Sequence, residues 1–241
     1  MTSGSAKTRE DVRLRVAGLA PDMALGFAYI GQTPLSKFPE LPHAVSLMVQ
    51  LDKAVAEAVT GGPNAAYYAE YLDKNDLLDS VAGQVAELIL GAGGRAVAVA
   101  ASKRTDPVGI KGDFPHKLAA VKAGLGWIGR SSLFLTREHG PWLRLATVLT
   151  DLALAPEGPL MKNHCGTCQK CVEACPAGAI AGNSWTPGLE RERLVDVRRC
   201  DVWKIEHYGQ FEGLVCGICM AVCPYGQKSR KRALDSRKKP G

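Results

Sequence analysis

The cysteines of this 241-residue chain constrain its fold more than any other feature, because all eight lie between residues 165 and 223. Four of them form the run Cys165-x2-Cys168-x2-Cys171-x3-Cys175, which Pro176 follows directly. This spacing is typical of bacterial ferredoxins, in which the first three thiolates bind one [4Fe-4S] cluster and the fourth binds the other. A short loop around a cube directs three sulfurs at three irons, and the helix after it carries the fourth sulfur away.

A second run supplies three more ligands of the same pattern, Cys216-x2-Cys219-x3-Cys223, and Pro224 follows it. This run lacks the first cysteine of the pattern, and Cys200 is the only cysteine left to replace it. The sequence therefore predicts two clusters that use every cysteine. The first predicted ligand set is Cys165, Cys168, Cys171 and Cys223, and the second is Cys175, Cys200, Cys216 and Cys219.

Three other arrangements of the cysteines remain open. Structural zinc could use four thiolates per ion, although zinc does not require the CxxCxxxCP form of the second run. Disulfide bonds are expected in exported proteins, and the start of this chain has neither an apolar segment nor a twin arginine. A three-iron or mixed cluster is the third alternative, because a sequence fixes ligands better than nuclearity.

The residues before the cysteines carry the patterns of a mixed domain. Apolar runs bounded by Gly, Pro or Asp predict five strands, at 24–30, 44–51, 95–101, 132–136 and 144–150. Helical spacing or capping residues predict three helices, at 8–18, 64–90 and 116–123. The loop at 103–115 is rich in glycine and proline and is the most plausible place for an active site.

The composition changes sharply near residue 155, and this change predicts the domain organisation. We expect an α/β (α+β) domain at 1–155, followed by a small ferredoxin-like domain at 156–227 with short helices at most. Residues 228–241 form a basic tail.

The tail accounts for the whole net charge of +6, because seven basic residues and one acidic residue follow Gln227. Such a run is usually a solvated, mobile end, and contact with RNA or an acidic protein is the alternative. No apolar stretch reaches the roughly eighteen residues that a membrane span needs. We therefore expect a cytoplasmic protein without membrane contact.

The segment Gly124-Leu-Gly126-Trp-Ile-Gly129 satisfies the G-x-G-x-x-G pattern of dinucleotide-binding sites. That pattern must follow a strand and open a helix, whereas here a predicted helix precedes it and a predicted strand follows it. A glycine at a helix end followed by a tight turn is the better interpretation.

Several segments together resemble the epoxyqueuosine reductase family, and their order and spacing are similar to the catalytic region of reductive dehalogenases. The segments are residues 123–130 (AGLGWIGR), residues 145–154 (LATVLTDLAL), the two cysteine runs, Arg198-Arg-Cys200 and Ile205-Glu206. The resemblance is specific over residues 117–226 and only architectural before them. It implies a cobalamin held between the α/β domain and a double-cluster domain, whose clusters reduce the cobalt.

The resemblance also implies which residues adjoin the corrinoid. In those families the glycine-rich turn lies beside it, which implies Gly124, Gly126, Trp127, Gly129 and Ser131 as its neighbours here. Glycines permit close backbone approach, and Trp127 offers a flat face. A role for Trp127 in the core is the structural alternative.

Epoxyqueuosine reductases also have an acidic residue shortly before this turn, where it is thought to donate a proton. The corresponding stretch here is residues 111–115, two or three residues short of that register, and its carboxylate is Asp113. Asp113 and His116 are the two candidate proton donors. A turn residue beside Lys111 is the alternative for Asp113.

These observations predict an iron-sulfur reductase whose two [4Fe-4S] clusters pass electrons to a cobalamin or to a substrate at the N-terminal domain. A ferredoxin or flavodoxin would supply the electrons. The competing prediction is an electron-transfer or reactivation partner of a corrinoid protein or another enzyme, without a substrate of its own. A tRNA substrate is supported only by the basic tail, since no large extension follows the clusters; a small-molecule substrate is the alternative.

Overall fold

The computed structural model describes residues 3–31, 33, 35–154, 156 and 158–227. They form two compact units, each assembled from separate segments. Of these described residues, unit 1 contains those within 1–50, 73–125 and 144–161, and unit 2 contains those within 51–72, 126–143 and 162–227. Unit 2 therefore takes two segments that the predicted division placed in the N-terminal domain. The predicted basic tail at 228–241 lies outside the described residues.

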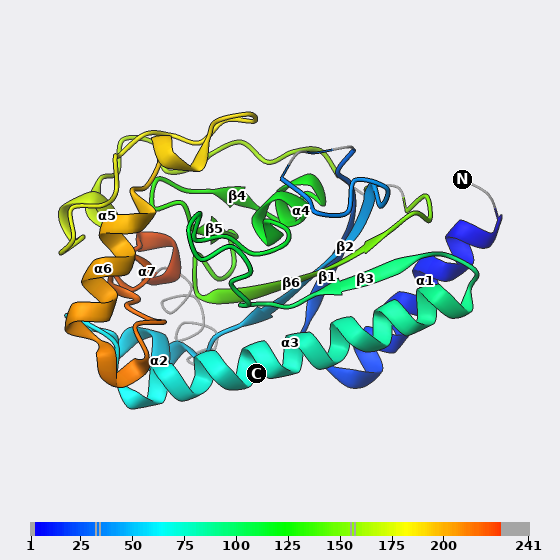
Figure 1. The fold of residues 1–241 in the computed structure, drawn as a ribbon, viewed down its shortest axis with the longest axis horizontal. Coiled ribbons are helices and arrows are strands. Elements are labelled where there is room, and N and C mark those ends of the chain that lie inside the picture. The colour runs from blue at the N-terminus through cyan, green and yellow to red at the C-terminus, as the bar shows by residue number, and fades with distance from the viewer. Residues whose placement is uncertain (1–2, 32, 34, 155, 157, 228–241) are drawn as a thin grey trace, which may run out of the picture. The chain divides into compact units, whose positions relative to one another are not determined.

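Unit 1 is built on a four-stranded sheet in the order β1-β2-β6-β3 (Figure 1). Its strands are β1 (Ala24–Tyr29), β2 (His43–Gln50), β3 (Ala96–Val99) and β6 (Leu143–Thr150). β1 pairs antiparallel with β2, with Phe27 opposite Val45, and β3 pairs antiparallel with β6, with Val97 opposite Leu149. All four were predicted, because each is a β-branched or apolar run between turn residues.

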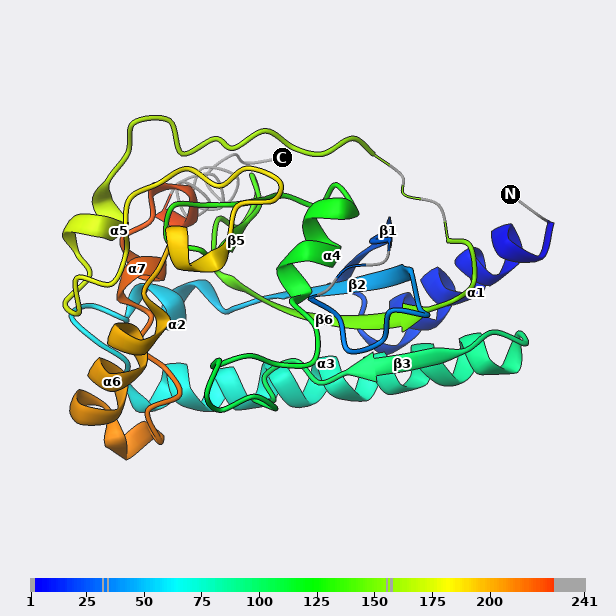
Figure 2. The same ribbon diagram turned by 45° about the horizontal axis from the view of Figure 1, so that its top comes forward.

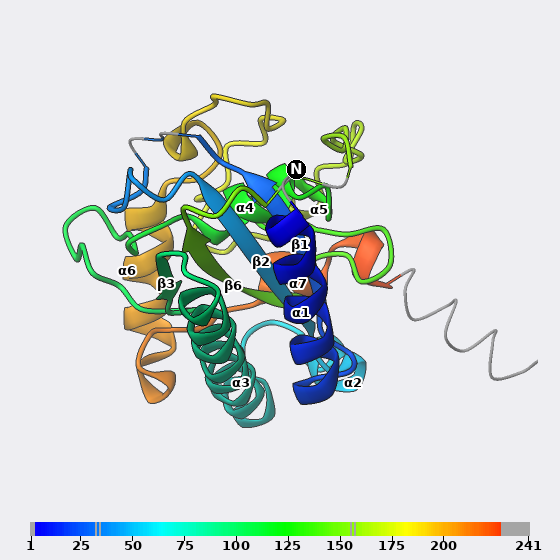
Figure 3. The same ribbon diagram turned by 90° about the vertical axis from the view of Figure 1, so that its right-hand side faces the viewer.

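Helices cover both faces of this sheet, because successive side chains of its strands point to opposite sides. Phe27 and Val148 pack with the helices α1 (Ser3–Leu19) and α3 (Ala65–Gly91). Their neighbours Ala28 and Leu149 pack with α4 (His116–Lys122). Figures 2 and 3 show α1 and α3 on one side of the sheet and α4 on the other.

Unit 2 has little regular structure. It contains the short hairpin of β4 (Trp127–Ile128) and β5 (Phe134–Leu135). Its other elements are α2 (Lys53–Glu57), α5 (Lys170–Glu173), α6 (Val197–His207), α7 (Ile218–Ala221) and the 3-10 turns η1 (Arg191–Arg193) and η2 (Gly209–Phe211). At 11 residues, α6 is longer than the short helices expected among the cysteines.

The core of unit 2 joins its three segments. Trp142 is fully buried and donates a hydrogen bond from Nε1 to the carbonyl oxygen of Met220 at 3.1 Å. Leu51 and Tyr67 belong to the same buried cluster. This cluster explains why residues 51–72 and 126–143 belong with the cysteines. In the described part of the chain, no helix is both long enough and apolar enough to span a bilayer.

Candidate iron-sulfur centre

Four cysteines come together where the loop at 165–171 meets the turn after α7. Burial first, and then the nearby Cys165 and Cys171, raise the pKa of Cys223 to about 11. Burial also raises the pKa of Cys171, and Cys165 and Cys168 add to the effect. Because these thiols influence each other's ionisation, they are neighbours in space. We call Cys165, Cys168, Cys171 and Cys223 group 1.

The other four cysteines form a second neighbourhood around α6 and α7. Burial raises the pKa of Cys200 and that of Cys216, and each also interacts with Cys175. The pKa of Cys219 rises strongly, first because the thiol is enclosed and then because Cys216 and Cys200 lie close. We call Cys175, Cys200, Cys216 and Cys219 group 2. Cys219 also interacts with Cys171, so the two groups adjoin each other.

Local hydrogen bonds shape the loop of group 1. Asn163 accepts the backbone N–H of Cys165 at 2.8 Å and donates its own amide to the Ile128 carbonyl at 3.0 Å. Gly166 has a φ of 54°, a left-handed conformation that turns the chain so that the Cys168 N–H donates to the Cys165 carbonyl at 3.1 Å. In group 2, the N–H of Ala179 donates to Cys175 Sγ at 3.4 Å.

The start of α6 positions Cys200, the ligand that no local motif contains. Asp196 caps the helix, because its side chain accepts the backbone N–H groups of Arg198 and Arg199 at 3.1 and 3.0 Å. Cys200 follows in the first turn of the helix. The signal for this helix was present in the sequence as an aspartate two residues before Arg198.

Arg130 links the loop of group 1 to Gly182, which follows Cys175 of group 2, through hydrogen bonds. Its guanidinium donates to the carbonyl oxygen of Gly166 at 2.5 Å and to that of Gly182. Arg130 thereby brings a permanent positive charge to the cysteine loop. Sequence reasoning did not single out this role, and its only signal was a cation directly after the glycine-rich turn.

The glycines of that turn are required by packing within the chain. A Cβ on Gly126 would lie 2.0 Å from the carbonyl oxygen of Leu135, and a Cβ on Gly129 would lie 3.3 Å from Cys165 Sγ. Gly124 has a φ of 73°, and a Cβ there would lie 3.2 Å from the Pro159 carbonyl. These glycines therefore allow close approach of other protein segments.

Trp127 belongs to the core of unit 2. It is fully buried, and its ring meets the rings of His164 and Tyr225 edge to face, each with centroids 5.0 Å apart. The Tyr225 hydroxyl donates to the His164 carbonyl at 3.0 Å, so Trp127 supports both ends of group 1. Within the described structure its Nε1 has no hydrogen-bond partner. Ser131 lies partly exposed in the β4–β5 turn.

Residues 164–226 match the family "4Fe-4S double cluster binding domain". Two groups of four neighbouring thiols are the donor set that a pair of [4Fe-4S] clusters requires. In the parts that the structure describes, no three His, Cys, Asp or Glu side chains lie close enough to hold a single metal ion.

The resemblance to epoxyqueuosine reductases is confirmed by the sequence of a relative. The chain is 37% identical over 113 residues to the epoxyqueuosine reductase of Cyclobacterium marinum. The aligned region covers 46% of this chain and 36% of that enzyme. It spans less than half the length of the first curated relatives that it matches.

Solved structures share the fold well beyond the double-cluster domain. An epoxyqueuosine reductase with a tRNA-Tyr epoxyqueuosine-modified stem loop matches with a TM-score of 0.64 and 17% identity, over 92% of this chain and 66% of that one. A reductive dehalogenase described in terms of B12-dependent dehalogenation matches with a TM-score of 0.68 and 20% identity, over 89% and 32%. At these identities the likeness concerns the fold.

Asp113 lies on the loop of unit 1 that was expected to carry an active site. Lys37 Nζ lies 2.5 Å from Asp113 Oδ1, and the Thr105 hydroxyl donates to the same oxygen at 2.6 Å. Lys37 first, and then Thr105, lower the pKa of Asp113 by stabilising the carboxylate. In this arrangement Asp113 is an ionised hydrogen-bond acceptor, and it must lose these partners before it can deliver a proton.

His116 occupies the start of α4 with both ring nitrogens satisfied. Nδ1 lies 2.9 Å from the Thr147 hydroxyl, and Nε2 lies 3.1 Å from the Ala100 carbonyl. Burial lowers its pKa to about 4. At neutral pH the ring is therefore neutral and is held between a strand and a loop by these two contacts, and proton donation by His116 stays a prediction.

The buried imidazole makes stability depend on pH. The folded pKa of about 4 lies below the ordinary value of 6.5, so the unfolded chain binds more protons between these values. At about 1.4 kcal/mol per pH unit, His116 should cost about 2 kcal/mol of unfolding free energy on going from about pH 7 to about pH 5. Denaturant unfolding should show a shallower pH dependence for His116→Gln. Equal pH dependences in wild type and variant would contradict this assignment.

Proposed function

We propose that the chain is an iron-sulfur reductase in which group 1 and group 2 each hold one [4Fe-4S] cluster. The observation that carries this proposal is the division of eight cysteines, distant in sequence, into two adjoining groups of four. Each cluster takes up or gives one electron without breaking a bond to the protein. Adjoining groups favour passage of an electron from one cluster to the other.

The residues around the cysteines would set the properties of the clusters. The Arg130 charge beside the group 1 loop favours the reduced, more negative state of a cluster there, and the Ala179 N–H does the same through Cys175 Sγ. The rings of Trp127, His164 and Tyr225 pack against one another beside Cys165 and Cys223 in the chain and would place apolar surface next to the group 1 cluster.

For the electron acceptor we propose a corrinoid, on the basis of the fold shared with a reductive dehalogenase described in terms of B12. The residues implied as its neighbours do not form a cradle for it: Gly124, Gly126 and Gly129 face other parts of the chain, and Trp127 is fully buried. Asp113 is the residue we propose for proton delivery, once Lys37 and Thr105 release it.

For the substrate we propose the epoxide-bearing nucleoside of a tRNA, as the names of the relatives suggest. The basic residues after Gln227 suit a polyanion. If this is right, a chain ending at Gly226 should bind a tRNA stem loop less tightly than the full chain, and the difference should shrink as salt rises.

Anaerobic purification tests the proposal in one preparation. We expect about eight irons and eight sulfides per chain, a broad visible absorption that bleaches on reduction, and a change in the corrin spectrum when cobalamin is added. Fewer than about four irons, or zinc in their place, would overturn the cluster assignment. Full clusters without any corrinoid binding would overturn the choice of acceptor alone.

One observation favours a second function, that of an electron-transfer or reactivation partner for another protein. Neither candidate proton donor is poised as an acid, because Asp113 is held as a carboxylate and His116 as a neutral ring. Under this alternative, Asp113→Asn would leave electron delivery to an external acceptor unchanged and no substrate would be consumed. Loss of substrate turnover in Asp113→Asn, with clusters and electron delivery intact, would favour the reductase.

A further inference from the structure

α6 presents an apolar strip to solvent on the side opposite its cysteine. Arg198, Val202 and Ile205 are spaced so that they share one face of the helix. Val202 is 52% exposed and Ile205 is 58% exposed. Leu214, 41% exposed, directly follows Gly213, and a Cβ on Gly213 would lie 2.9 Å from Ile205 Cγ1. Contiguous exposed apolar residues of this kind mark interaction sites.

This strip lies directly over group 2. Cys200 is on the same helix, and the Arg199 guanidinium reaches over Gly178, where a Cβ would lie 3.2 Å from its Nη2. Gly178 in turn donates its N–H to the carbonyl of Cys175, another member of the group, at 3.0 Å. The inward side of α6 is fixed by the ion pair of Lys204 with Asp201 at 3.2 Å. A protein docked on the strip would have one helix between itself and group 2.

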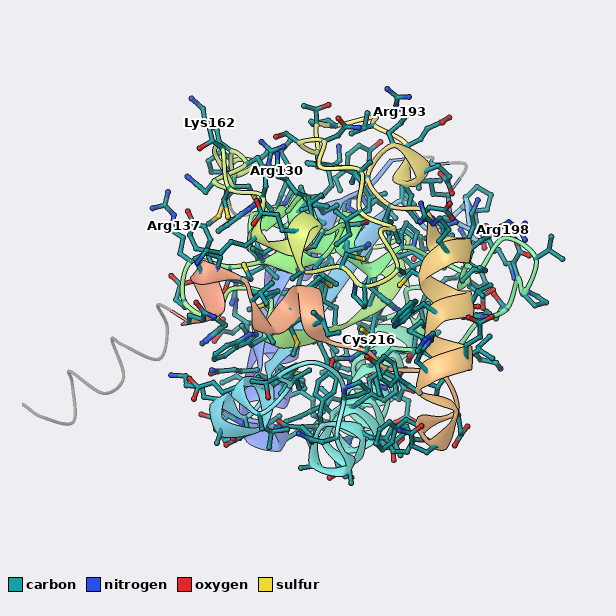
Figure 4. The ribbon with its side chains drawn as sticks, turned by 90° about the vertical axis from the view of Figure 1, so that its left-hand side faces the viewer. Arg130, Arg137, Lys162, Arg193, Arg198 and Cys216 are labelled. Carbon is teal, nitrogen blue, oxygen red and sulfur yellow. The ribbon has the colours of Figure 1, made fainter. Side chains whose placement is uncertain are left out.

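Positive charge surrounds the N-terminal end of the strip. Arg193, Arg198 and Arg199 are exposed there, and Figure 4 shows Arg193 and Arg198 directed outward on the face that also carries Arg130, Arg137 and Lys162. The acids nearby are partly engaged: Glu192 pairs with Arg191 at 2.8 Å, and Asp196 caps the helix. Glu206 and Glu212 lie toward the C-terminal end.

We propose that the α6 strip, made of Val202, Ile205 and Leu214 with the arginines Arg193, Arg198 and Arg199, docks an acidic one-electron carrier protein of the small iron-sulfur or flavin class. The carrier gives up one electron and the group 2 cluster gains it; no bond forms or breaks and no proton moves. The inference rests on the clusters of the proposed function and on nothing else in it. A small apolar centre with a charged rim suits a transient redox complex, in which charge accelerates encounter.

The test measures how fast a carrier reduces the clusters. Wild type and two double variants are mixed in a stopped-flow instrument with a reduced acidic plant-type ferredoxin, and the rate of cluster reduction is measured. The test variant is Arg198→Glu/Val202→Ser. The control is Arg15→Glu/Leu14→Ser, which changes the same types of exposed residue on α1. We expect the α6 variant to react about tenfold or more slowly, the control to match wild type, and the wild-type rate to fall with salt. Dithionite, which needs no docking surface, should reduce all three equally.

Other results would overturn the proposal. An α6 variant that holds its iron and reacts with the carrier as fast as wild type removes the docking role. A variant that keeps the carrier rate but loses binding of a tRNA stem loop also overturns the proposal, because the strip is then an RNA contact. A variant that converts a wild-type dimer to a monomer overturns it as well, because the strip is then a contact between two copies of the chain. Arg193→Glu, which lies outside α6, replaces the double variant if the latter loses iron. If the protein binds no corrinoid or turns over no substrate, the rate at which the carrier reduces the clusters can still be measured and interpreted.

Discussion

Replacing Cys200 with serine should remove one cluster and leave the other in place. Cys200 belongs to group 2 with Cys175, Cys216 and Cys219, and none of the group 1 cysteines has been implicated as its neighbour. A thiolate is the ligand that iron in these clusters requires, and serine supplies it poorly. Iron should fall from about eight to about four per chain, and the paramagnetic signal of one reduced cluster should disappear.

Cys165→Ser is the matched control for this experiment, because it removes a ligand of group 1. It should cause the same loss of iron, but the remaining signal should be that of the other cluster. The two variants should therefore leave different spectra. Identical residual spectra, or complete loss of iron from both variants, would show that the eight cysteines do not divide in this way.

Gly126→Ala should destabilise unit 2, with or without any ligand. Its Cβ would lie 2.0 Å from the Leu135 carbonyl oxygen and 2.7 Å from the Phe134 ring, so the pairing of β4 with β5 cannot persist. We expect the free energy of unfolding to fall by about 3 kcal/mol, the upper end of the usual cost of overpacking. The midpoint of thermal unfolding should then fall by about 6 °C or more, since about 1 kcal/mol shifts the midpoint of a chain this size by about 2 °C or more.

Gly83→Ala provides the control for Gly126→Ala. Gly83 lies within α3, and a Cβ there would meet no atom within 4 Å. Alanine should therefore stabilise the helix by about 0.5–1 kcal/mol. If Gly126→Ala unfolded like wild type and lost only corrinoid binding, Gly126 would be a ligand contact and its packing role would be wrong.

The strands of the four-stranded sheet and the long helix α3 were predictable from their apolar runs and apolar periodicity. Leu78 and Val85, two members of the predicted apolar stripe, are fully buried in α3, and the strand predicted at 44–51 corresponds to β2. The division into units was not predictable from composition, because it depends on contacts such as that of Trp142 with Met220, 78 positions apart. No local pattern records such a contact.

The candidate site shows the same limit. Cysteine spacing was enough to propose the ligand sets, because each run is local and only Cys200 is remote. His116 looked like a proton donor because histidine titrates near neutral pH, and only the fold shows its partners Thr147 and Ala100. Arg130 was overlooked because its two carbonyl partners follow it by 36 and 52 positions.

The core of unit 2 is built from separate segments of the chain, and this limits how the cysteine region can be transferred between proteins in evolution. Leu51, Tyr67 and Trp142 complete the hydrophobic cluster that holds Met220, yet all three precede the first cysteine. A gene fragment encoding only residues 164–226 would leave that cluster without its partners. We therefore do not expect residues 164–226 to fold when they are moved alone into another protein: recombination that transfers them must also transfer the distant segments that complete this hydrophobic cluster, or the new host must supply substitutes.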